Sequence, residues 1–223
     1  MADKQPSVSY GDYLALEELL RLQRPRSKPE HPDELLFIVV HQSSELWFKV
    51  IIQQLHAVAG QLKQGDAQLA LWHMQRLNTL MRIVAEQLGS LDTLPPQRFQ
   101  QFRDFLGASS GQQSSQFKEI VALSSPQLEE HFLALVADRG KTLEWLYTGP
   151  GPEQLFFLAE ALLEYDQAFQ RWRFLHVQLV ERIIGPMTKG TAGSMGAGYL
   201  AQSVNSRFFP ALWDVRAKLF VAK

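Results

Sequence analysis

Two long stretches of this chain have the apolar spacing of amphipathic helices, and each places a histidine among the apolar residues. With 3.6 residues per turn, one face of the first stretch carries Phe37, His41, Ser44, Phe48 and Ile51. One face of the second stretch, nearer the C-terminus, carries Phe169, Trp172, His176, Val180 and Ile183. A bundle built on these helices would point two imidazoles into its interior. The pattern indicates a helical bundle that encloses a flat, apolar ligand.

Helical signals also dominate the rest of the chain. Apolar spacing, prolines and glycines predict helices over residues 13–23, 33–63, 67–88 and 153–184. Further helices open at Pro95-Pro96 and Ser125-Pro126, and a short one follows Phe208-Phe209-Pro210. The sequence shows neither the alternating runs of strands nor an internal repeat. We therefore predict an all-α fold.

Length and composition favour one ordinary globular domain. The chain has 223 residues, of which 46% are hydrophobic and 20% charged. We expect a single helical domain over residues 1–223, whose N-terminal arm of about residues 1–32 ends in the proline-rich stretch 24–32. No segment reads as a signal peptide or as a membrane span of roughly 18 apolar residues. We expect a cytoplasmic protein with no membrane partner.

Charge and cysteine content exclude several classes of function. The formal net charge of −1 gives no reason to expect nucleic acid as a partner. The chain has no cysteine, which excludes disulfides, thiolate catalysis, iron–sulfur clusters and a thiolate haem ligand.

Other metal and phosphate sites fit the sequence poorly. The glycine-containing stretch 185–191 follows a helix, and its lysine precedes the second glycine, so it lacks the order of a phosphate-binding loop. No histidine has a glutamate three residues before it, as di-iron bundles require. His31 and Asp33 could supply two ligands of an iron triad, but their place beside Pro32 favours helix capping.

The remaining candidates are His41, His176, Arg103 and the glycine-rich stretch 185–198. Each also has an ordinary structural explanation. A histidine on an apolar stripe is often a core residue bonded to a backbone carbonyl, an arginine in a helix pairs with a nearby carboxylate, and glycine-rich loops lie on surfaces. The residues taken singly leave both readings open.

Six blocks of sequence are more specific. In order they are 9–14, 33–47, 102–111, 172–176, 190–196 and 208–216, reading SYGDYL, DELLFIVVHQSSELW, FRDFLGASSG, WRFLH, GTAGSMG and FFPALWDVR. Together they resemble the tryptophan 2,3-dioxygenase family. The resemblance implies an all-helical, homotetrameric enzyme with haem b, whose iron is ferrous during turnover.

The resemblance also implies roles for individual residues. His176 matches the proximal haem ligand, His41 the distal histidine near the indole nitrogen, and Arg103 the arginine that binds the substrate carboxylate. Other residues, all within the matching blocks except Phe99, are assigned to the two binding sites. Those of the substrate site are Phe37, Phe99, Thr191 and, from a neighbouring subunit, Tyr10 and Tyr13; those of the haem site are Ser110, Gly111 and Trp172.

The chemistry of these residue types suits the implied reaction, which adds dioxygen across the indole C2–C3 bond of L-tryptophan to give N-formylkynurenine. A neutral imidazole ligand suits a dioxygen-binding haem. The guanidinium of Arg103 can bond both carboxylate oxygens. Neutral His41 can accept the indole N–H, and a glycine-rich segment with Thr191 can approach a ligand closely.

The chain departs from the family pattern at several positions. Phe99 replaces a tyrosine, and Gln112, Lys118 and Val121 replace a phenylalanine, an arginine and a glutamate. The region 120–153 is shorter than usual by several tens of residues. Two alternatives therefore stay open. One is a divergent relative that oxygenates another indole or aromatic amino acid, with one oxygen atom or two; the other is a non-catalytic haem-binding or sensing protein.

Overall fold

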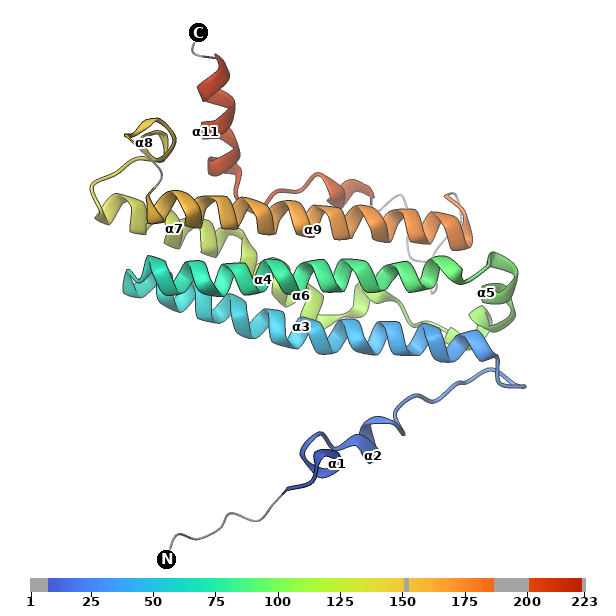
Figure 1. The fold of residues 1–223 in the computed structure, drawn as a ribbon. Helices are drawn as coiled ribbons and strands as arrows, with labels where there is room; N and C mark the ends of the chain where they lie inside the picture. Colours follow the sequence, from blue (N-terminus) through green and yellow to red (C-terminus); the bar gives the residue numbers. More distant parts are fainter. Residues whose placement is uncertain (1–7, 151–152, 187–200, 222–223) are drawn as a thin grey trace, which may run out of the picture.

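The computed structural model describes residues 8–150, 153–186 and 201–221. These residues form helices and no strand, which confirms the predicted all-α class. Three long helices dominate: α3 (Pro32–Gln64), α4 (Ala67–Gln87) and α9 (Gln154–Ile184). Figure 1 shows them stacked lengthwise, with α4 between the other two in that view.

Local sequence explains where α3 and α4 begin and end. His31 caps α3 by accepting the N–H of Asp33, and Pro32 occupies the first turn, where no hydrogen bond is lost. Gly65 ends α3 in the left-handed region at φ 77°, and Asp66 then caps α4 by accepting the N–H of Leu69 at 2.9 Å. This two-residue connection makes α3 and α4 antiparallel neighbours.

The core lies between these helices. Its fully buried apolar side chains include Ile51, Val58, Met74, Leu77, Val84, Leu158 and Leu162. Each such side chain contributes roughly 1.5–3 kcal/mol relative to an exposed position. By length and a mean hydropathy of 1.5, α3 also meets the criterion for a membrane span, contrary to the sequence expectation. One face of α3 packs against α4, α6 and α7, and 17% of the apolar window is buried.

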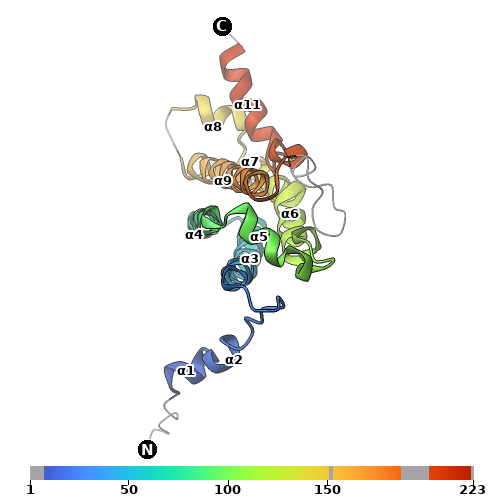
Figure 2. The ribbon, with the colours of Figure 1, turned by 90° about the vertical axis from the view of Figure 1, so that its right-hand side faces the viewer.

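Shorter helices complete the bundle. They are η1 (Leu88–Thr93), α5 (Pro96–Arg103), η2 (Asp104–Leu106), η3 (Gly111–Gln113), α6 (Ser115–Ala122), η4 (Leu123–Gln127), α7 (Leu128–Asp138), α8 (Leu143–Thr148) and α11 (Pro210–Val221). The end-on view in Figure 2 places α6 on the side of α3 and α9 opposite to α4. The start of α3, the end of α9 and α5 lie at one end of the bundle (Figure 1).

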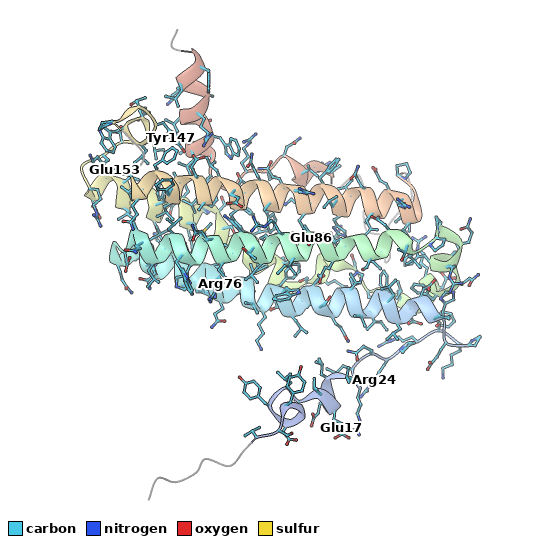
Figure 3. The ribbon with its side chains drawn as sticks, in the orientation of Figure 1. Glu17, Arg24, Arg76, Glu86, Tyr147 and Glu153 are labelled. Atoms are coloured by element: carbon cyan, nitrogen blue, oxygen red, sulfur yellow. The ribbon has the colours of Figure 1, made fainter. Side chains whose placement is uncertain are left out.

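The N-terminal arm differs from the sequence prediction. The helix expected over residues 13–23 is wrong: two single-turn helices form instead, α1 (Tyr10–Tyr13) and α2 (Leu16–Leu19), separated by Ala15 at φ 48°. A left-handed residue cannot continue a right-handed helix. The arm, with Glu17 and Arg24, extends away from the bundle (Figure 3).

Candidate active site

His41 lies on the first half of α3, and its hydrogen bond fixes its tautomer. Nδ1 is 2.7 Å from the carbonyl oxygen of Phe37, which can only accept, so Nδ1 carries the proton. The neutral ring therefore has a lone pair free on Nε2. Solvent reaches the residue, yet enough protein surrounds the ring that desolvation lowers the pKa of His41, outweighing the opposing effects of Phe37 and Glu45. His41 is an acceptor at neutral pH.

His176 lies on the last third of α9, where its ring packs beside Trp172. Burial and, to a lesser extent, the charge that His41 carries when protonated lower the pKa of His176 to about 4. Phe48, two turns beyond His41 on α3, meets Trp172, one turn before His176 on α9, so the two helices contact each other in this region. Both are neutral at pH 7, and neutral imidazole is the form that binds metal.

Aromatic rings pack beside His176. The ring of Trp172 is centred 5.2 Å from the His176 ring, and Phe117 of α6 lies 5.3 Å from Trp172. Phe48 of α3 meets Trp172 edge-on at 6.1 Å. Trp172 is 8% exposed, and its buried Nε1 has no hydrogen-bond partner among the described residues. An unsatisfied buried donor indicates an acceptor outside the described residues.

A second aromatic group joins α3 to α5. The Phe37 ring is centred 4.2 Å from His41, 5.6 Å from Phe99 and 5.8 Å from Phe102. Phe99 is buried, and the half-buried Arg103 ends the same helix. His41, Phe37 and Phe99 are thus brought together, with a cation one turn beyond Phe99.

Other predicted residues lie elsewhere. Tyr10 and Tyr13, 75% and 80% exposed, lie in α1 on the arm, which extends away from the bundle (Figure 1). Ser110 caps η3 through a capping box with Gln113, and Gly111 begins that helix. Thr191 lies outside the described residues.

Sequence reasoning missed Phe117. Its ring stacks on Phe169 at 5.7 Å and closes the aromatic wall beside Trp172. The spacing of Phe117 and Ile120 on one face of a short helix was the available signal.

A cavity of about 500 Å³ lies apart from the histidines, between α4, η1 and α9. Glu86 lines it on α4 (Figure 3), together with Arg82, Asp92, Arg171 and Arg182. Along α9 it is lined by Ala168 and Leu179, which lie on the same helix face as Trp172 and His176, but not by those two residues themselves. Its lining combines arginines with acidic residues, and neither His41 nor His176 is part of it.

Comparison with known proteins identifies the family. The family model described as tryptophan 2,3-dioxygenase matches residues 2–125 and 126–219. The chain belongs to the tryptophan 2,3-dioxygenase family. A protein named tryptophan 2,3-dioxygenase from Kineococcus radiotolerans is 34% identical, in an alignment that covers 98% of this chain and 94% of the relative. A protein of the same name from Serratia proteamaculans is 33% identical, with 98% of this chain and 96% of the relative aligned. The protein of that name from Herpetosiphon aurantiacus is 36% identical over 96% of this chain and 99% of its own.

Membership in the tryptophan 2,3-dioxygenase family confirms the resemblance and the class of enzyme, a haem-dependent oxygenase. The alignment with the Kineococcus protein extends over 280 positions, whereas this chain has 223 residues. The relative therefore has segments that this chain lacks.

The residues fit a haem. His176 offers a neutral imidazole, aromatic rings provide apolar walls, and the unsatisfied Nε1 of Trp172 would suit a propionate oxygen. Among the described residues, no group of three or more His, Cys, Asp and Glu side chains could hold a metal ion. Iron in a porphyrin needs only an axial protein ligand.

Proposed function

We propose that this protein adds both atoms of dioxygen across the C2–C3 bond of the indole of L-tryptophan, giving N-formylkynurenine. The observation that carries the proposal is a pair of neutral imidazoles, His41 and His176, on two helices that contact each other through Phe48 and Trp172. One of them can hold iron while the other meets a substrate. A core histidine would need no second imidazole opposite to it.

His176 is the residue that would hold the haem iron, through a ring nitrogen. When bound, the haem supplies the iron that binds dioxygen and the redox chemistry of the reaction. The low pKa of His176 keeps its ring nitrogen free of a competing proton throughout the physiological range. Trp172, one turn before it, packs against the imidazole and fixes its orientation.

His41 and Arg103 are proposed to orient the substrate. The free lone pair on Nε2 of His41 accepts the indole N–H, and the bond from Nδ1 to the Phe37 carbonyl holds the imidazole in that tautomer. Phe37 offers its ring to the indole, and Arg103 binds the carboxylate. Fixing both ends of the substrate places its C2–C3 bond and excludes water from it, which is the contribution of the protein.

The direct test uses haem-loaded protein that has been reduced without oxygen. L-Tryptophan and dioxygen are then added, and the absorbance of N-formylkynurenine is followed. Isotopically labelled dioxygen and mass spectrometry count the inserted oxygen atoms. Two labelled atoms in N-formylkynurenine support the proposal; a product with one labelled atom, or reduced protein that does not consume tryptophan, refutes it.

Phe99 favours a second candidate for the substrate. The resemblance places a tyrosine hydroxyl at this position near the carboxylate, whereas Phe99 offers only a buried phenyl ring. A less polar site suits an indole or aromatic amino acid with a modified carboxylate or ring. Comparing kcat/KM for L-tryptophan, its methyl ester and ring-substituted tryptophans decides between the two, because a preference for a modified substrate of tenfold or more would displace L-tryptophan.

We also propose that the pocket is completed by a second copy of the chain. The arm carries exposed Tyr10, Tyr13 and Leu20 away from its own bundle, which is costly unless another surface covers them. A homo-oligomer, most simply a tetramer, gives these side chains a neighbouring pocket to enter.

A further inference from the structure

His31 contacts α5 as well as its own helix. Its Nε2 lies 2.8 Å from Oε1 of Gln101, which is 70 residues away in sequence. Its ring also packs against Phe102, with centroids 5.3 Å apart. Gln101 and Phe102 are the residues immediately before Arg103, so His31 contacts the last turn of the helix that carries the proposed carboxylate ligand.

The two polar contacts of His31 require one tautomer. The backbone N–H of Asp33 donates to Nδ1 at 3.2 Å, so Nδ1 carries no proton. The neutral ring then holds its proton on Nε2, which donates to the side-chain amide oxygen Oε1 of Gln101. Both nitrogens are therefore used, one to cap α3 and the other to hold α5.

Neighbouring groups fix the position of His31 itself. Its backbone N–H donates to Oγ of Ser27 at 2.8 Å, and that hydroxyl donates to the buried carboxylate of Glu34. A second link joins the same two helices, since Arg98 of α5 pairs with Asp33. The first turn of α3 is thus a rigid base from which two side chains reach α5.

Helix α5 depends on such contacts because it is short. It spans eight residues, and Pro95 gives it no side-chain cap. Small rotations of so short a helix would move the guanidinium of Arg103 by distances that matter for a hydrogen bond.

We propose that His31 is a positioning residue, which holds α5 through Gln101 and thereby aligns Arg103 with the substrate carboxylate. This inference rests on the proposed function, in which Arg103 binds that carboxylate. His31 does not itself touch the substrate. It fixes the direction from which the guanidinium approaches.

Two variants separate this role from helix capping. His31→Asn keeps an N-cap acceptor for Asp33 but is too short to reach Gln101, and Gln101→Leu leaves the cap untouched. Gln101→Glu keeps an acceptor for Nε2–H and serves as the rescue. Gln100→Leu is the matched control, because Gln100 is exposed on the same helix and its side chain makes no hydrogen bond to the described part of the chain.

Two measurements on haem-loaded protein are compared. Hydrogen exchange of the peptide covering residues 96–106 reports whether α5 is held. Equilibrium binding of L-tryptophan against tryptamine, which lacks the carboxylate, reports whether Arg103 is aligned. In His31→Asn and in Gln101→Leu we expect faster exchange of this peptide. We also expect the ratio of the affinities for tryptophan and tryptamine to fall about two- to fivefold. The double variant should equal either single one, and Gln101→Glu and Gln100→Leu should match wild type.

Unchanged exchange in both variants would overturn the contact, whatever the activity of the protein. Faster exchange with unchanged discrimination would show that His31 only stabilises the helix and would overturn the positioning role. Failure of the wild type to bind or oxidise tryptophan is a different result: it refutes the proposed function, and exchange still decides whether His31 holds α5.

Discussion

At the scale of single residues, the chemistry depends on which groups stay neutral. Desolvation keeps His176 neutral, so its nitrogen is available to a metal without displacing a proton. We predict that His176→Ala purifies with little haem, and that added imidazole restores binding. The Soret absorbance per protein measures this. His56→Ala removes an exposed histidine of α3 and should retain full haem content. A full Soret band in His176→Ala without imidazole would contradict the assignment.

His41 gives a prediction about pH. The pKa of His41 is lowered from 6.5 by burial, so the acceptor on Nε2 is present above that lowered pKa and is lost as pH falls through it. The acid limb of kcat/KM should therefore lie below pH 6.5 and be absent in His41→Ala. That variant should keep its haem and lose roughly tenfold or more in turnover, since an unpaired indole N–H costs about 1–3 kcal/mol. Unchanged kinetics with a lower Tm would make His41 a core residue only.

Arg103 should make the protein bind tryptophan, which has a carboxylate, more tightly than tryptamine, which has none. Leaving a buried carboxylate without its partner costs on the order of 2–5 kcal/mol, so Arg103→Ala should raise KM for tryptophan by tens-fold or more. Binding of tryptamine should hardly change. Arg82→Ala, which removes an exposed ion pair with Glu164, serves as the control. Equal affinity of the wild type for tryptophan and tryptamine would argue against the contact.

At the scale of elements, buried acceptors hold the C-terminal helix. Asp166 of α9 is fully buried and accepts the N–H of Phe208 at 3.1 Å and Nε1–H of Trp213 at 2.7 Å. Asp166→Ala leaves both donors unpaired and should lower the free energy of unfolding by about 2–5 kcal/mol. Urea unfolding followed by circular dichroism measures the loss. Asp214→Ala, at an exposed position of α11, should stay within about 0.5 kcal/mol of wild type.

Elements also show what sequence could predict. The periodic stripes of α3 and α9 define long helices, and the structure confirms them, because burial of one face decides a long helix. The prediction of one helix over residues 13–23 was wrong because Ala15 adopts a left-handed conformation, which the sequence pattern does not indicate. At the site, the stripes selected His41 and His176 as candidates, and their roles stay predictions. The contact of His31 with Gln101 follows only from the packing of α5 on α3, which residue spacing does not encode.

At the scale of the whole molecule, the arm makes a prediction about assembly. Tyr10 and Tyr13 are exposed on an arm that extends away from its own bundle, so we predict that the proposed site of one chain is incomplete alone. We expect an oligomer by light scattering, and a large loss of kcat/KM in the Tyr10→Ala/Tyr13→Ala double variant with haem content unchanged.

Mixed oligomers test the sharing directly. Arg103→Ala subunits have a defective pocket and intact arms, whereas Tyr10→Ala/Tyr13→Ala subunits have an intact pocket and defective arms. When the two are co-expressed, an arm of the first can enter a pocket of the second and restore it. Random mixing should therefore return a substantial fraction of wild-type activity, although each variant alone is nearly inactive. If the mixture is no more active than the sum of its parts, or if a fully active monomer is found, the arms do not complete a neighbouring site.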